Sequence, residues 1–375
     1  MIPFVNLQAQ YKILANRINE SIKQVLDSSD YILGSQVSTL EERLAKYLNV
    51  GYALSCSSGT DALLMILMTK KLVKGDAVFT SPFTFFASSE VITLAGGTPV
   101  FVDIDENTYN LNPVFLERKI EQVCLDNFFQ PKGIIPVDLF GIAADYNRIN
   151  KIAKDHNLFV LEDAAQSFGA DYHGKRAGNL ADIAATSFYP AKPLGCYGDG
   201  GAVFTNDSEL YEKLVSLRVH GQATNGDKYD NVRIGLNARM DTIQAAILLE
   251  KLKIYDDERE ARNRVAAAYT ERLKDVVQTP IVPDGQTSVW AQYSVQASNR
   301  DEVRMALQEQ GIPTAVFYPI PIHLSTAYKH LGYKQGDFPV AEAVSKRIFS
   351  LPMHPYLEEP QIDQICEVIT KVARR

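Results

Sequence analysis

The first two-thirds of the chain alternates short apolar runs with stretches whose apolar residues recur at helical spacing. Amphipathic helices are predicted at 36–47, 60–71, 112–123 and 146–156. Short runs rich in β-branched and aromatic residues predict strands at 52–56, 77–80, 100–103, 133–137 and 159–161. This alternation indicates an α/β fold with a mostly parallel central sheet flanked by helices. Ligands bind beyond the carboxyl ends of the strands in such sheets, so the residues that follow the strands are the first site candidates.

The pattern changes near Met240. Residues 241–272 predict one long helix, and the alternating run 288–295 predicts a strand. Further helical patterns follow at 300–310, 340–349 and 360–374. We therefore expect a large α/β domain over 1–250 and a smaller α+β C-terminal domain over 251–375.

Composition narrows the class of protein. A length of 375 residues suits two domains, and 46% hydrophobic residues can form a substantial core. The net charge of -7 and the lack of a basic run argue against a nucleic acid partner, although a few arginines and backbone amides could still hold a nucleotide diphosphate. No signal peptide and no apolar run of roughly 18 residues stand out, so no membrane partner and a cytoplasmic location are expected.

The four cysteines and six histidines show no metal-ligand spacing. We expect reduced thiols and no metal site. The sequence also shows no internal repeat.

The most informative residue is Lys192, in the run TSFYPAKPLG that starts at Thr186. Asp163 ends the run that contains the predicted strand 159–161, and it precedes this lysine in the sequence. A lone lysine that follows a strand-closing carboxylate is what pyridoxal 5'-phosphate (PLP) chemistry needs, because the amine forms a Schiff base with the aldehyde and the carboxylate keeps the pyridine nitrogen protonated.

Other candidates have simpler explanations when taken singly. Ser58-Gly59-Thr60 follows a strand and opens a helix, which suits a phosphate but also describes an ordinary helix cap. Phe85 could stack on the pyridine ring or belong to the core. The glycines at 198, 200 and 201 indicate a tight reversal between strands rather than a nucleotide fingerprint. The order of these features along one chain favours the PLP interpretation.

Three strings, EDAAQSFGA from Glu162, TSFYPAKPLGCYGDGGAVFTND from Thr186 and GLNARMD from Gly235, closely resemble the sugar aminotransferases of the DegT/StrS type. The resemblance extends from Tyr31 to the string LPMHPYL at Leu351. It implies the aspartate-aminotransferase-like PLP fold, a homodimer with a shared active site, and pyridoxamine 5'-phosphate as the form of the cofactor between the two half-reactions. Lysine at 192 favours transamination over the dehydration performed by family members with histidine there.

The resemblance also implies residue roles. Lys192 matches the Schiff-base lysine and Asp163 the partner of the ring nitrogen. Gln166 matches the contact to the phenolic oxygen, and Phe85 the aromatic stacking position. The phosphate cradle corresponds to Gly59, Thr60 and Ser187, completed by Asn237 from the second subunit.

Substrate-binding candidates are Arg239, Tyr318 and His323, with the Arg239 guanidinium suited to gripping a carboxylate. Within the family the likeness is greatest to enzymes that move the amino group of L-glutamate to the 3-keto carbon of UDP-2-acetamido-2-deoxy-3-keto-glucuronic acid. These enzymes serve bacterial surface polysaccharides such as the lipopolysaccharide O-antigen. Phe317 departs from the histidine found before the tyrosine in a relative. The alternatives are a 4-keto or 3-keto-6-deoxy sugar nucleotide as the substrate, or a non-catalytic regulatory protein that keeps the fold.

Overall fold

The computed structural model describes residues 2–223 and 229–373. Its centre is a seven-stranded sheet with the strand order β1-β9-β8-β5-β4-β2-β3. The strands are β1 (Tyr52–Cys56), β2 (Asp76–Thr80), β3 (Thr98–Phe101), β4 (Gln130–Ile135), β5 (Phe159–Asp163), β8 (Ile183–Ser187) and β9 (Gly201–Thr205). The sheet is parallel from β8 to β3, and β9 runs antiparallel to both β8 and β1. The prediction of a mostly parallel sheet is confirmed.

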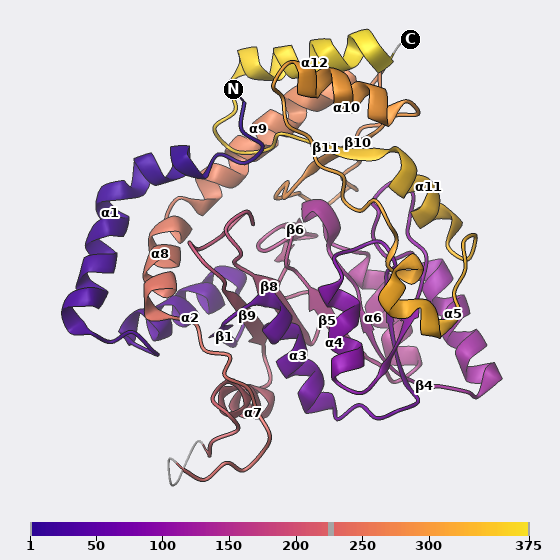
Figure 1. Ribbon diagram of the computed structural model, residues 1–375. Coiled ribbons are helices and arrows are strands. Elements are labelled where there is room, and N and C mark those ends of the chain that lie inside the picture. Colours follow the sequence, from indigo (N-terminus) through magenta and orange to yellow (C-terminus); the bar gives the residue numbers. More distant parts are fainter. Residues whose placement is uncertain (1, 224–228, 374–375) are drawn as a thin grey trace.

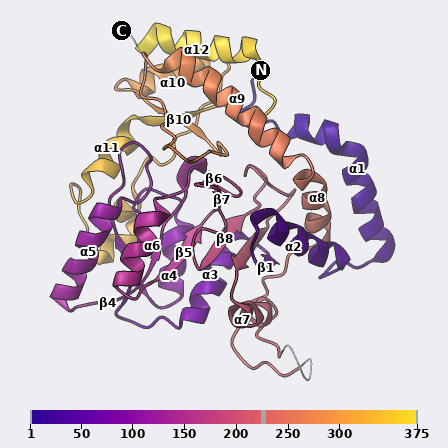
Figure 2. The same ribbon diagram turned by 180° about the vertical axis from the view of Figure 1, so that it is seen from behind.

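Helices cover both faces of this sheet (Figure 1 and Figure 2). Apolar side chains of one face pack against α3 (Gly59–Lys70), α4 (Ala87–Leu94) and α7 (Ser208–Arg218). The other face packs against α2 (Ser35–Leu48), α5 (Pro113–Asp126), α6 (Tyr146–Asp155) and α8 (Thr242–Leu252). Helix α1 (Leu7–Ser28) lies along α8. Strands buried on both faces explain the continuous apolar runs of the sequence.

A smaller unit lies above the sheet in Figure 1, and both ends of the chain lie on this side of the molecule. It contains α9 (Tyr255–Leu273), β10 (Tyr293–Gln296), α10 (Arg300–Glu309), α11 (Pro339–Arg347), β11 (Ile348–Leu351) and α12 (Glu359–Ala373). Strands β10 and β11 pair antiparallel, and Ile2 is buried in the same apolar core. Short β6 (Asp171–Tyr172) and β7 (Lys175–Arg176) form a hairpin of the large unit. The domain boundary at 250 and 251 stays a prediction.

Three predicted elements differ from the structure. The long helix 241–272 is interrupted between α8 and α9, because Asp256, Asp257 and Glu258 form an acidic first turn, which stabilises a helix start. The strand expected over 288–295 begins only at Tyr293, since Val289 N donates to Gly141 O across the domain interface. The helix expected over 340–349 ends at Arg347, where β11 starts.

Strands β8 and β9 are not among the predicted strands, although they flank the Lys192 segment. Small residues in β8, such as Ala184 and Ala185, weaken the strand signal that bulky β-branched residues give.

The two units contact each other through aromatic and polar groups. Phe83, Phe101 and Tyr109 of the large unit pack with Tyr328 and Phe338 of the small one.

The start of α11 is held by a large-unit carboxylate. Asp103 accepts hydrogen bonds from Val340 N and Ala341 N, both at 2.9 Å. Among the described residues, no helix is both long enough and apolar enough to span a membrane.

Candidate active site

A cavity of about 550 Å³ opens at the carboxyl ends of the parallel strands, between the large unit and the segment around Tyr318. Most of the residues predicted for the site line it. These are Gly59, Thr60, Phe85, Asp163, Gln166, Ser187, Lys192 and Tyr318. The sheet topology brings them together, because β1, β5 and β8 all end at this edge.

Lys192 lies in the loop that joins β8 to β9. Backbone hydrogen bonds close this loop, from Phe188 N to Gly200 O at 2.7 Å and from Cys196 N to Phe188 O at 2.8 Å. The buried ammonium of Lys251 on α8 donates to the Gly195 carbonyl oxygen and so stabilises the loop. Burial lowers the pKa of Lys192, and the nearby Asp163 carboxylate opposes this shift. A lysine with a lowered pKa is better able to act as a nucleophile and base.

Asp163 is the last residue of β5 and is buried. Its carboxylate accepts hydrogen bonds from Ser88 Oγ at 2.8 Å and Ala165 N at 3.2 Å. Burial raises the pKa of Asp163, while these two hydrogen bonds and Lys192 act in the opposite direction. The carboxylate is therefore oriented toward the cavity by two fixed donors.

Two further buried carboxyl groups lie behind Asp163, and the sequence analysis did not single them out. Asp138 accepts from Ala144 N and Tyr146 Oη, both at 2.9 Å, and from Ser167 Oγ at 2.8 Å. Glu162 accepts from the backbone N–H groups of Gly178 and Leu180. Burial raises the pKa of Asp138 to about 7 and that of Glu162 above its usual range. Asp138 follows a strand, and that position was the signal available in the sequence.

The start of α3 forms a cradle beside β8. Ser58 caps the helix, since its Oγ accepts from Asp61 N at 3.0 Å. A Cβ atom added to Gly59 would lie 2.7 Å from Ser187 Cβ, so only glycine allows this close approach. A helix N-terminus flanked by the Thr60 and Ser187 hydroxyls is a ready anion site. The capping and phosphate-binding explanations of this tripeptide are thus compatible.

Gln166 connects the large unit to the small one. Its Oε1 accepts from Phe140 N at 2.8 Å, and its Nε2 donates to Tyr318 Oη at 3.2 Å. Because Phe140 N–H must face the amide oxygen, the orientation of the Gln166 amide is fixed. Phe317, next to Tyr318, also lines the cavity and lies 6.4 Å from the Phe4 ring, centroid to centroid.

Three predicted residues do not line the cavity of their own chain. Asn237 is exposed and Arg239 is partly buried, in a segment held beside the cradle by Ser57 N, which donates to Ala238 O at 3.0 Å. His323 is buried away from the cavity, with its Nε2 3.1 Å from Glu342 Oε1. Gln292, which the sequence analysis missed, lines the cavity instead.

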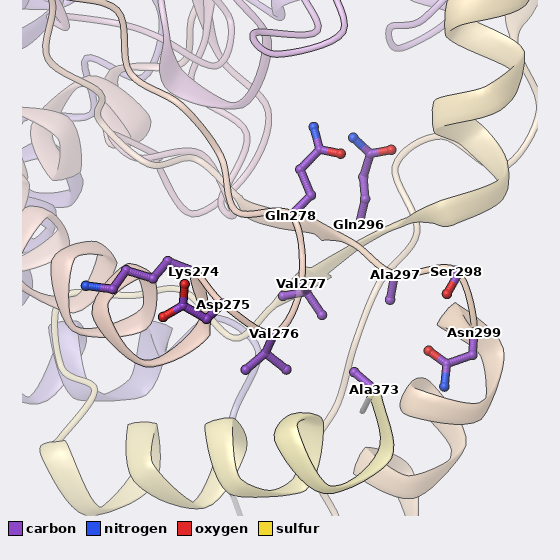
Figure 3. A pocket seen from close by; sticks show the side chains of 10 residues that line it. All are labelled: Lys274, Asp275, Val276, Val277, Gln278, Gln296, Ala297, Ser298, Asn299 and Ala373. Carbon is purple, nitrogen blue, oxygen red and sulfur yellow. The ribbon is translucent and has the colours of Figure 1, made fainter. Parts of the chain in front are cut away.

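A second hollow, of about 460 Å³, lies in the small unit and contains none of the predicted site residues (Figure 3). It is lined by Lys274, Asp275, Val276, Val277, Gln278, Gln296, Ala297, Ser298, Asn299 and Ala373. Over 2–223 and 229–373, no group of three or more His, Cys, Asp or Glu residues is placed to hold a metal ion.

Comparison with known proteins identifies the family of the chain. The DegT/DnrJ/EryC1/StrS aminotransferase family matches residues 12–370. The chain belongs to this family. It is 45% identical over 371 residues to the UDP-2-acetamido-2-deoxy-3-oxo-D-glucuronate aminotransferase of Pseudomonas aeruginosa, covering 99% of this chain and 100% of that one. It is 43% identical to a pleiotropic regulatory protein of Geobacillus stearothermophilus (100% and 99% covered). Identity is 39% to the dTDP-3-amino-3,6-dideoxy-alpha-D-galactopyranose transaminase of Aneurinibacillus thermoaerophilus (99% of each covered).

Solved structures agree with this assignment. A family aminotransferase from Brucella abortus superposes with a TM-score of 0.97 at 50% identity and full coverage of both chains. A sugar aminotransferase from Streptococcus pneumoniae, solved in its PLP form, superposes with a TM-score of 0.88 at 27% identity, covering 96% of each chain. The predicted aminotransferase fold is confirmed, and this sugar-nucleotide aminotransferase is PLP-dependent.

The residues present fit PLP. A buried carboxylate with two fixed donors, a partly buried lysine and a helix N-terminus line one cavity. These groups match the ring nitrogen, the aldehyde and the phosphate of PLP in charge and chemistry.

Proposed function

We propose that this aminotransferase moves the amino group of L-glutamate to the 3-keto carbon of UDP-2-acetamido-2-deoxy-3-keto-glucuronic acid. The observation that carries the proposal is the 45% identity, over the whole length of both chains, to the Pseudomonas aeruginosa enzyme named for this sugar. A cavity lined by Lys192, Asp163, Gln166 and Ser187 supports it. The product would serve a diacetamido uronic acid of a bacterial surface polysaccharide, made in the cytoplasm.

When bound, PLP supplies an aldehyde that accepts the amino group and a ring that withdraws electrons from the reacting carbon. Lys192 would hold the aldehyde through Nζ and, once displaced by the glutamate amine, would carry a proton from the glutamate α-carbon to the former aldehyde carbon. Asp163 would keep the ring nitrogen protonated, and Gln166 Nε2 would donate to the phenolic oxygen. Thr60, Ser187 and the amides at Gly59 would bind the phosphate, with Phe85 against the ring.

The site is proposed to be completed in a homodimer. Asn237 and Arg239 do not line the cavity of their own chain, and they lie in a segment that passes the phosphate cradle. This placement is compatible with Asn237 reaching the phosphate of a second subunit and Arg239 gripping a substrate carboxylate there. Tyr318 is the proposed sugar contact within the chain.

A different keto sugar nucleotide is the second candidate. Phe317 gives the wall an apolar ring backed by Phe4, which suits the methyl group of a 6-deoxy sugar better than a uronate carboxylate. The 39% identity to a transaminase for a dTDP-linked 3-amino-3,6-dideoxy sugar supports this alternative.

The decisive experiment follows the visible absorbance of the PLP-loaded protein. L-glutamate is the first amine donor, followed by a UDP-linked 3-amino uronate, a dTDP-linked 3-amino-6-deoxy sugar and a 4-amino hexose, each added separately. Loss of the absorbance with glutamate and the 3-amino uronate alone supports the proposal. A response to another amino sugar instead keeps the reaction class and replaces the substrate. No response to any donor would favour a regulatory role, the function named for the Geobacillus relative.

A further inference from the structure

Ser88 is a buried residue of the cavity wall whose hydroxyl contacts Asp163 directly. It belongs to the first turn of α4, and its Oγ donates to Asp163 Oδ2 at 2.8 Å. The side chain is only 2% exposed and lines the active-site cavity. Ser88 N donates to Phe85 O at 3.3 Å, so one turn carries both this hydroxyl and the aromatic ring proposed to lie against the cofactor.

A second hydroxyl determines the direction of these hydrogen bonds. Thr84 Oγ1, also buried in the cavity wall, lies 3.3 Å from Ser88 Oγ. An ionised Asp163 only accepts hydrogen bonds, so the single hydroxyl proton of Ser88 points to Asp163, and Ser88 Oγ accepts from Thr84. The result is a chain of donors from Thr84 through Ser88 to the carboxylate, and hydrogen bonds in such a chain strengthen one another.

Ser88 is the only side chain of the described residues that donates a hydrogen bond to the Asp163 carboxylate, since the other donor is the backbone N–H of Ala165. Burial raises the pKa of Asp163, and the Ser88 hydrogen bond lowers it more than Ala165 N or the charge of Lys192 does. Three further titratable groups interact electrostatically with Asp163, namely Asp138, Tyr146 and Tyr318.

This hydrogen bond affects how strongly Asp163 competes for a proton. A donor stabilises the ionised form of a carboxylate and makes it a weaker base. In the role proposed for Asp163, one proton is shared between its carboxylate and the ring nitrogen of PLP. The weaker the carboxylate is as a base, the more this proton stays on the nitrogen, where it increases the electron withdrawal by the ring. Burial alone would draw the proton toward Asp163, and Ser88 opposes that effect.

We propose that Ser88 is a positioning residue that acts through Asp163, and that its hydroxyl keeps the shared proton on the ring nitrogen of the cofactor. Thr84 supports it as the donor to Ser88 Oγ. The inference rests on the proposed role of Asp163, and it does not depend on which keto sugar is the substrate.

The test is Ser88→Ala in protein loaded with PLP that carries nitrogen-15 in its ring. In wild type we expect the NMR signal of a protonated ring nitrogen, and in Ser88→Ala a shift toward that of the unprotonated nitrogen. Ser89→Ala is the matched control, because Ser89 is buried in the same turn of α4 and its Oγ donates to Phe86 O at 3.0 Å, outside the cavity. An unchanged signal in Ser88→Ala, or the same shift in Ser89→Ala, would overturn the inference.

A double-mutant comparison tests whether Ser88 acts through Asp163. The rate of the glutamate half-reaction, followed by cofactor absorbance, should fall about tenfold in Ser88→Ala. The same substitution made in Asp163→Asn should cause little further loss, because the carboxylate is already absent. Equal losses in the two backgrounds would contradict the inference. An unprotonated ring nitrogen in wild type would instead refute the role proposed for Asp163.

Discussion

At the scale of single residues, the proposed chemistry depends on a lysine and a carboxylate whose burial shifts their proton affinities in opposite directions. Burial lowers the pKa of Lys192 and raises that of Asp163, and each group opposes the shift of the other. Ser88 and Ala165 hold the carboxylate in place. Each group thus favours the charged form of the other, against the effect of burial.

Lys192→Ala is expected to abolish turnover while the protein retains PLP, because Asp163 and the phosphate cradle are untouched. Turnover is measured with both substrates, and retained cofactor by absorbance after gel filtration. Lys175→Ala, on the exposed hairpin, is the control. Measurable turnover in Lys192→Ala would contradict the assignment.

Asp138 predicts a pH dependence of stability. Burial raises its pKa to about 7 in the folded protein, so the folded state binds this proton more tightly than the unfolded chain does. The resulting stabilisation is complete below the usual pKa of about 4 and is lost as the pH rises through about 7. Asp138→Asn should therefore reduce, by several degrees, the fall in Tm of the cofactor-free protein between pH 5 and pH 8.

Asp171→Asn, at the first residue of β6, where Asp171 Oδ1 accepts from Gly174 N, serves as the comparison and should leave this fall unchanged. If the Tm of Asp138→Asn falls between pH 5 and pH 8 as much as that of wild type, other groups cause the pH dependence.

At the scale of elements, the site is built where loops leave the sheet, and neighbouring elements hold those loops. The β8–β9 loop that carries Lys192 is closed by its own backbone and supported by Lys251 from α8. The first turn of helix α11 in the small unit donates two hydrogen bonds to Asp103, which follows β3. Elements from both units therefore determine the shape of the cavity.

Asp103→Ala should destabilise the protein by about 1–2 kcal/mol, since it removes the only carboxylate that accepts from Val340 N and Ala341 N among the described residues. Urea unfolding measures the change. Asp103→Asn keeps one acceptor oxygen and should recover part of the loss. An unchanged midpoint in Asp103→Ala would show that the contact contributes nothing to stability.

At the scale of the whole molecule, one chain supplies a cavity with a lysine, an acid and a proposed phosphate cradle, while Asn237 and Arg239 lie beside the cradle without lining that cavity. A symmetric dimer would let these residues serve the second subunit. The proposal of a shared site therefore concerns how two whole chains assemble, and not any single residue or element.

Complementation tests the shared site. Lys192→Ala and Asn237→Ala chains, each with little activity, are denatured, mixed and refolded together. If Asn237 serves the other subunit, each mixed dimer has one intact site, and about a quarter of wild-type activity should return after random pairing. If the activity of the refolded mixture does not exceed the sum of the two variants, Asn237 acts in the site of its own chain.

Local sequence patterns were sufficient to predict much of the fold and the cofactor of this protein. Alternating strands and helices predicted the layered α/β architecture, and the strings around Asp163 and Lys192 predicted the cofactor chemistry, because both depend on residues close together in the chain. Strands β8 and β9 escaped prediction since their stability comes from pairing with distant strands rather than from their own composition.

Tertiary structure alone decided which side chains meet. It turned His323 toward Glu342 and away from the cavity, gave Gln166 a fixed orientation through Phe140, and placed Asp138 behind Asp163. It also brought Gln292 into the wall from more than a hundred residues away in sequence from Asp163. Such contacts depend on how units fold against each other, and a one-dimensional pattern carries information on spacing but not on these approaches.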